Sequence, residues 1–227
     1  MKIGVLLLSL AIALWSCSEF LSEEIEDAII RVNSPTDSLF TNTNTLTFWW
    51  ESEANIESYR FQLASPSLGN PTSLLDTLIF EERISFVLTQ GVFEWRVRGE
   101  NANSFSSYVG GVVIKDSIPP GTPNLINPQT GDTLSLATNS LSFSWTSGDL
   151  LIDGRQFSIS DSVYLYRFIG QETALISSIS GSSPQNLSAT LSSVFPGGVV
   201  EYGWQIRSRD KAGNSSQSDI QSFFLRM

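Results

Sequence analysis

A short alternating motif occurs twice in this chain and constrains its fold more than any other feature. The pattern Leu-x-Phe-x-Trp ends at Trp50 in the first copy and at Trp145 in the second. Further along each copy, the pattern Trp-x-(Val/Ile)-Arg begins at Trp95 and at Trp204. Because successive side chains of a strand point to opposite faces, the apolar residues of each motif share one face. The chain therefore predicts two copies of one β-structure, with these four tryptophans in the cores.

Other alternating runs, separated by turn residues, add further strands to each copy. In the first copy they cover 28–32, 58–63, 74–80, 84–88 and 108–114; in the second they cover 123–126, 156–159, 163–169, 174–179, 187–191 and 220–225. Sustained helical periodicity does not occur outside the first residues. About seven short strands per copy predict an all-β fold of two tandem antiparallel β-sandwiches.

The residues after the second motif tryptophan resemble the sixth-strand signature of fibronectin type III and related bacterial Ig-like domains. The matching positions are Trp204, Ile206, Ser208, Asp210, Gly213 and Ser215, and in the first copy Trp95, Val97, Gly99, Asn101 and Ser106. Both copies have Trp where the family usually has Tyr, and Ser104 replaces the glycine in the first copy. The run from Gly91 also resembles Bacteroidota cell-surface repeats. The resemblance implies tandem fibronectin-III/Ig-like domains over residues 28–227.

The first residues read as an export signal. A basic start at Lys2 precedes an apolar stretch over 4–15, which is shorter than the roughly 20 residues of a membrane-spanning helix. The tetrapeptide ending at Cys17 resembles the lipobox of bacterial lipoproteins, although Trp15 departs from it. The resemblance implies a signal peptide over 1–16 and acyl chains on Cys17. Each CH₂ group of such a chain that is buried in the bilayer adds about 0.8 kcal/mol to membrane binding. The alternative is an ordinary secreted protein with a cysteine near the cleavage site.

Residues 17–27 form an acidic segment, since five of the ten residues that follow Cys17 are Asp or Glu. It reads as a solvated tether or, by resemblance to Bacteroidota lipoproteins, as a signal for the outer cell surface. We expect the first domain over 28–116, a Pro-rich linker over 117–123 and the second domain over 124–227.

Composition excludes several classes of function. The chain has no His, which removes Ser-His-Asp triads and the common zinc sites, and its single Cys forms no intramolecular disulfide. A net charge of −10 argues against nucleic acid as a partner. Glu81 and Glu82 are paired carboxylates, but glycoside hydrolysis needs two carboxyls facing each other across a cleft. We expect no enzymatic activity, no cofactor and no metal.

Several side chains remain as candidate contacts. Alternation turns Trp49 away from Trp50, so it either stacks on a sugar or partner protein or packs under a neighbouring segment. Alternation also turns four arginines outward, and we expect these to pair with Asp and Glu across strands rather than to bind anions: Arg96, Arg98, Arg207 and Arg209. Five aspartates are read as turn residues, with calcium as the alternative: Asp116, Asp149, Asp153, Asp161 and Asp210.

The interpretation that best fits these features is a lipid-anchored cell-envelope protein, held in the outer membrane by acyl chains on Cys17 and exposed at the surface. Its role would be non-catalytic: a spacer, an adhesion element or an accessory subunit with a protein partner in the envelope. The alternative is a glycan-binding lipoprotein that uses Trp49 and loop aromatics such as Tyr164 and Tyr166.

Overall fold

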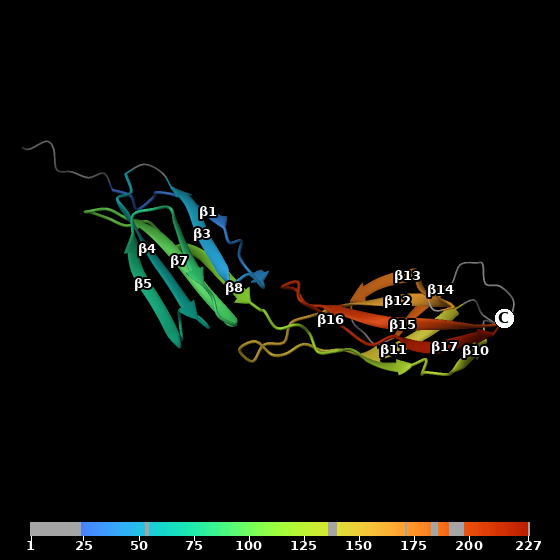
Figure 1. Ribbon diagram of the computed structural model, residues 1–227. Helices are drawn as coiled ribbons and strands as arrows, with labels where there is room; N and C mark the ends of the chain where they lie inside the picture. Colours follow the sequence, from blue (N-terminus) through green and yellow to red (C-terminus); the bar gives the residue numbers. More distant parts are fainter. Residues whose placement is uncertain are drawn as a thin grey trace, which may run out of the picture. The chain divides into compact units, whose positions relative to one another are not determined.

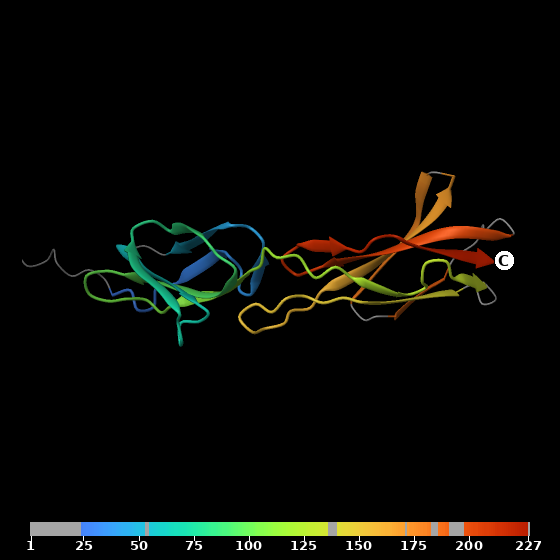
Figure 2. The ribbon, with the colours of Figure 1, turned by 60° about the horizontal axis from the view of Figure 1, so that its bottom comes forward.

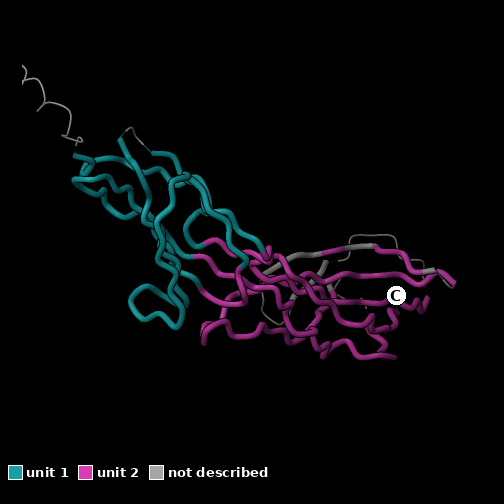
Figure 3. Tube along the Cα trace, turned by 60° about the vertical axis from the view of Figure 1, so that its left-hand side comes forward, with its two compact units in different colours: residues 1–38, 45–87, 93–112 teal, residues 39–44, 88–92, 113–227 magenta. Residues whose placement is uncertain are grey.

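The computed structural model describes residues 24–52, 55–135, 140–170, 172–182, 186–190 and 198–226, and over these ranges it contains seventeen strands and no helix. The chain divides into two compact units, shown in teal and magenta in Figure 3. Unit 1 comprises residues 1–38, 45–87 and 93–112, and unit 2 comprises residues 39–44, 88–92 and 113–227. In the described part of the chain, no helix has the length and apolar character needed to cross a membrane.

The first eight strands, coloured blue to green in Figure 1, form two sheets. They are β1 (Ile30–Ser34), β2 (Leu39–Thr41), β3 (Thr45–Ser52), β4 (Ser58–Ser65), β5 (Ser73–Ile79), β6 (Arg83–Val87), β7 (Gly91–Glu100) and β8 (Val109–Lys115). One sheet has the order β1-β3-β6 and the other β2-β8-β7-β4-β5. Strand β3 pairs antiparallel with β1 and β6, and β4 pairs antiparallel with β5 and β7, whereas β2 and β8 are parallel.

The first core is built from aromatic side chains on the inward faces of β3, β4 and β7. Phe48, Trp50 and Phe61 are fully buried, and Trp95 is 1% exposed. The Phe48 ring meets the Trp95 ring edge-on with centroids 5.0 Å apart, and Trp50 stacks on Phe61 at 6.1 Å. Such pairs add about 0.5–1.5 kcal/mol beyond the burial of apolar area. The two motif tryptophans of the first copy, Trp50 and Trp95, are therefore buried in the core, as the alternation in the sequence predicts.

The remaining strands repeat this arrangement. They are β9 (Asn124–Asn127), β10 (Thr133–Ser135), β11 (Ser140–Thr146), β12 (Ser160–Ile169), β13 (Glu172–Ser182), β14 (Asn186–Thr190), β15 (Val199–Arg209), β16 (Ser215–Gln217) and β17 (Gln221–Arg226). The order β9-β11-β14 corresponds to β1-β3-β6, and β10-β17-β15-β12-β13 corresponds to β2-β8-β7-β4-β5. Strand β16 pairs with β15 outside this path. Figure 2 shows the joined ends of β12 and β13, in orange, turning away from the rest of their sheet.

The second core holds the other two motif tryptophans, with Trp145 3% exposed and Trp204 fully buried. The Phe143 and Trp204 rings lie 5.1 Å apart between centroids. The two copies differ in whether the indole N–H groups of these tryptophans have hydrogen-bond acceptors. Trp145 donates to Asp161 and Trp204 to the carbonyl oxygen of Pro128, whereas the Nε1 atoms of Trp50 and Trp95 have no hydrogen-bond partner among the described residues.

The predicted fold class, all-β with two tandem antiparallel sandwiches, is confirmed. One expected strand, at 156–159, is wrong, because only residue 155 in that neighbourhood makes a bridge, and it pairs with Ile152. The short strands β2, β10 and β16 were not expected from the sequence. The domain limits proposed from the sequence stay a prediction.

Candidate functional site

The predicted lipid-attachment residue, Cys17, lies outside the described residues, as does most of the acidic segment. Lipidation and its consequences for localisation therefore stay predictions.

Trp49 lies where alternation predicts, on the outward face of β3. Its side chain is 45% exposed, while its neighbour Trp50 is fully buried. The residues beside it on the sheet are Arg83 of β6 and Ser34 of β1. Its aromatic surface is thus open on a polar sheet face, in a form that either a sugar ring or a partner side chain can contact. Its role in binding stays a prediction.

Tyr164 and Tyr166 are not loop residues, and that expectation is wrong. Both lie in β12, on the face opposite the buried Val163 and Leu165. The Tyr166 hydroxyl donates to Gln205 Oε1 at 3.1 Å. Burial, and secondarily the neighbouring Tyr164, raises the pKa of Tyr166 above its ordinary value.

The outward arginines of the first copy, Arg96 and Arg98, interact with side chains of their own copy. Arg98 forms an ion pair with Glu100, with 2.7 Å between nitrogen and oxygen, and its guanidinium lies 4.2 Å above the Phe105 ring. Arg96 donates to Gln62 at 2.6 Å and lies 4.1 Å above the Tyr108 ring.

A cross-strand pair on the same sheet face is made by Arg60 and Asp76. The hydrogen bond from Arg60 is the main cause that lowers the pKa of Asp76 below its ordinary value, and a second bond comes from Gln62. The predicted pairing with an acid across strands is thus wrong for both arginines. Arg98 pairs with Glu100 of its own strand, and Arg96 is held by the Gln62 amide and the Tyr108 ring.

The outward arginines of the second copy do not follow the same prediction. Arg207 contacts the Ser215 hydroxyl at 3.3 Å, and within the described ranges neither Arg207 nor Arg209 makes an ion pair with a carboxylate. The expected partners are missing because the strands on either side present serines. Ser162 and Ser160 of β12 stand opposite the two arginines, and Ser215 of β16 stands opposite Arg209.

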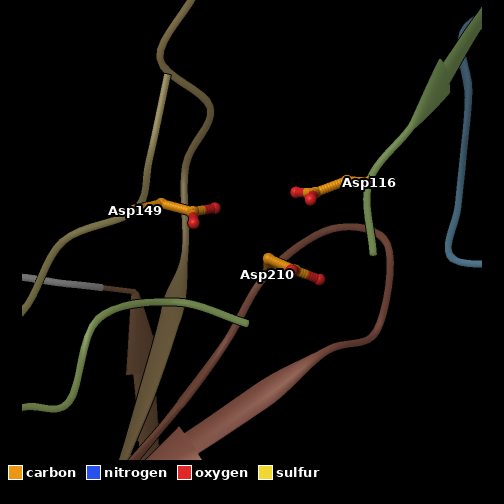
Figure 4. A group of neighbouring side chains, drawn as sticks. All are labelled: Asp116, Asp149 and Asp210. Atoms are coloured by element: carbon orange, nitrogen blue, oxygen red, sulfur yellow. The ribbon is translucent and has the colours of Figure 1, made fainter. Parts of the chain in front are cut away.

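Three of the five candidate aspartates come together within unit 2. Asp116 follows β8, Asp149 lies in the loop after β11, and Asp210 follows β15. In Figure 4 the side chains of Asp116 and Asp149 point toward each other, and that of Asp210 lies next to them. One carboxylate oxygen from each lies within 4.8 Å of the others. Burial is the main cause that raises the pKa of Asp149, with repulsion from Asp116 and Asp210 adding to it.

Turn hydrogen bonds account for two of these carboxylates. Asp116 Oδ1 accepts from Gln90 Nε2 at 2.8 Å and from the Ile118 amide at 3.0 Å. Asp210 accepts from the backbone amide of Asn214 at 2.8 Å and from its side chain at 2.7 Å. Such bonds are the usual role of aspartate in turns. The oxygen donors are of the kind that Ca²⁺ takes, but the turn chemistry explains their placement without an ion.

The other two aspartates lie elsewhere. Asp153 accepts from the Val92 amide at 2.7 Å, and Asp161 is a buried acceptor in the second core. The adjacent carboxylates Glu81 and Glu82 also contact different partners. Glu82 Oε1 accepts from the Ser52 amide at 3.0 Å and from the Tyr59 hydroxyl at 3.1 Å, while Glu81 lies 3.7 Å from Arg83. Each carboxylate thus has its own structural partner.

No protein-family profile matches the chain, and no curated protein matches it. Solved structures similar to it include the FN1–FN3 domains of chicken CNTN1, at 12% identity and a TM-score of 0.45, covering 86% of this chain and 67% of that one. They also include three N-terminal domains of the highly immunogenic outer capsid protein Hoc of bacteriophage RB49, at 10% identity and a TM-score of 0.45, covering 88% of this chain and 70% of that one.

Proposed function

We propose that this chain is a lipid-anchored cell-envelope protein with a non-catalytic binding or structural role, as a spacer, an adhesion element or an accessory subunit of an outer-membrane or surface complex. The anchor rests on the apolar stretch over 4–15 and on Cys17 at the end of the lipobox-like tetrapeptide. Acyl chains fix the amino end to a bilayer, and the two sandwiches present their surfaces to other molecules.

The observation that carries the binding role is the edge strand β5. It ends the order β2-β8-β7-β4-β5, so one side of its backbone has no strand of the described residues beside it. Its outward side chains Leu74 and Leu78 are 53% and 47% exposed, and Phe80 directly after it is 82% exposed. An open edge recruits a strand of another chain through backbone hydrogen bonds, and apolar side chains beside it supply the contact area. These features support a protein partner at β5.

Site-specific photo-crosslinking in the native bacterium tests this role. A photoreactive phenylalanine replaces Leu78 in one variant and Arg155, an exposed loop residue, in the control. We expect one envelope protein to crosslink from position 78 and not from position 155, and to be lost when Leu74 is changed to Lys. Identical crosslinking from both positions, or none from 78, would refute the binding role of β5.

The glycan-binding alternative is favoured by the exposed ring of Trp49. Binding to a glycan array by the wild type and by Trp49→Ala distinguishes it. Loss of specific binding in the variant, with unchanged thermal stability, supports a sugar contact at this ring, whereas the same pattern for both proteins eliminates it.

A further inference from the structure

The outer face of β12, β15 and β16 contains an open hollow that the proposed role does not use. Its volume is about 410 Å³, and its lining residues are Ser160, Ser162, Tyr164, Arg207, Arg209, Gly213 and Ser215. We refer to these residues as the arginine face. The hollow lies in the size range of sites for small ligands, roughly 300–1,000 Å³.

The local sequence explains why these side chains gather. Ile206 and Ser208 of β15 are buried, so Arg207 and Arg209 point outward from the same strand. The antiparallel register sets Ser162 and Ser160 opposite them on β12. Gly213, in the turn before β16, has a φ of 96°, and a Cβ atom there would meet Arg209 Nη2 at 3.4 Å. Glycine thus permits this backbone conformation close to the guanidinium.

In the first copy, the sheet face equivalent to the arginine face carries an acidic residue beside its arginine. Aligning Trp95 with Trp204 places Arg98 at Arg207 and Glu100 at Arg209. In the first copy the ion pair between Arg98 and Glu100 occupies the guanidinium. In the second copy the acidic partner is itself an arginine, so two guanidinium groups stand two residues apart without a carboxylate among the described residues.

The second ion pair of the first copy, Arg60 with Asp76, also has no counterpart opposite Arg207. Arg60 of β4 stands opposite Arg98 and pairs with Asp76 of β5. The corresponding position opposite Arg207 is Ser162. The first copy therefore pairs Arg60 and Arg98 with carboxylates of its own sheet. The described lining of the hollow in the second copy has two arginines and no acidic residue, in a chain whose net charge is −10.

We propose that the arginine face binds an acidic saccharide, a sugar that carries a carboxylate or a sulfate group. Guanidinium groups bind oxyanions through paired, charge-assisted hydrogen bonds, which suits Arg207 and Arg209. Among the described residues, the rest of the lining is serine hydroxyls, one glycine and the Tyr164 ring, with no aliphatic side chain. A protein interface centres on apolar and aromatic anchors, whereas hydroxyls beside one aromatic ring match the hydroxyls and the ring face of a sugar.

This site is separate from the β5 edge and does not depend on the proposed function or on lipidation. Both arginines are exposed, so salt screens their attraction for an anion, with a Debye length of about 8 Å at physiological ionic strength. Binding through this face should therefore weaken as salt increases.

The test measures binding of the purified mature chain to four probes: a sulfated heparin tetrasaccharide, a tetragalacturonate, neutral cellotetraose and a tetraglutamate peptide. The informative variant is Arg209→Glu, which installs the self-neutralised arrangement of the first copy. The control is Arg155→Glu, which makes the same charge change at an exposed loop residue outside the arginine face. Thermal unfolding of both variants reports on the fold, and Arg207→Ala provides a second, uncharged change at the site.

We expect at least one acidic tetrasaccharide to bind, with an affinity that falls at least tenfold in Arg209→Glu and Arg207→Ala and remains unchanged in Arg155→Glu. The sulfated and carboxylated arms identify which acid group is preferred. The proposal is overturned if neither acidic sugar binds, if cellotetraose binds equally well, or if Arg209→Glu binds like the wild type. Tighter binding of tetraglutamate than of either sugar would assign the face to an acidic protein instead.

Discussion

Replacing Asp161 with alanine should destabilise the second sandwich without affecting the first. Asp161 is 2% exposed, and its carboxylate accepts three hydrogen bonds. They come from Trp145 Nε1 at 2.7 Å, Ser147 Oγ at 2.5 Å and Ser208 Oγ at 2.6 Å. The carboxylate thus holds a core tryptophan of β11 and a buried serine of β15 together with β12.

The magnitude follows from what the substitution leaves behind. Trp145 and Ser208 are buried, and each donor left without an acceptor costs about 1–3 kcal/mol. Part of this is offset because a carboxylate no longer has to be desolvated, so we expect a net loss of about 3 kcal/mol. At about 4 °C for each kcal/mol, the transition of the second sandwich should fall by about 12 °C.

Calorimetry of the mature chain measures this shift. Ser147→Ala is the matched control, because Ser147 is half-buried and its removal leaves the other two bonds to the carboxylate in place. The control should lose less than about 1 kcal/mol. A loss for Asp161→Ala that is no larger than that of the control would refute the role given to this carboxylate.

Two further predictions concern the backbone and pH. Gly110→Ala should destabilise unit 1 by about 1–3 kcal/mol, as measured by urea unfolding, because the added Cβ would lie 2.0 Å from the Trp95 carbonyl oxygen. The control Gly69→Ala should leave the stability unchanged, because no atom lies within 4 Å of the added Cβ. Burial and the nearby Asp116 and Asp210 raise the folded pKa of Asp149 above 3.8, so the folded state favours the protonated carboxyl and stability falls as pH rises through that pKa. Asp149→Asn should therefore be more stable than the wild type at pH 7, with the difference vanishing toward pH 3. A loss in Gly69→Ala equal to that in Gly110→Ala, or equal stability of Asp149→Asn and wild type at pH 7, would contradict these accounts.

The fold was largely predictable because its main strands carry a period-two apolar pattern. Trp50, Trp95, Trp145 and Trp204 are buried as expected, since one strand face has to fill the core. The run at 156–159 alternates as well, but a strand needs a hydrogen-bonded neighbour, and no pairing in the described sheets uses it. Strands β2, β10 and β16 are three residues each, too short for a pattern, and exist through pairing with β8, β17 and β15.

The candidate site was less predictable because it depends on what stands across from each residue. An outward arginine is visible in the sequence, but whether it meets Asp76 or Ser162 depends on register. One signal was nonetheless present, because aligning the two copies sets Glu100 against Arg209. By contrast, Asp116, Asp149 and Asp210 come from three distant loops, and nothing in their spacing distinguishes them from Asp153 and Asp161.

The most direct test of the proposed role is mass spectrometry of the amino-terminal peptide of the protein purified from its native membrane fraction. We expect a mature chain that begins at Cys17, carries a diacylglyceryl group on the sulfur and stays with the membrane in carbonate buffer. The same chain with Cys17→Ser should remain uncleaved or be released. An unmodified Cys17 in a protein that carbonate extracts from the membrane would contradict the account.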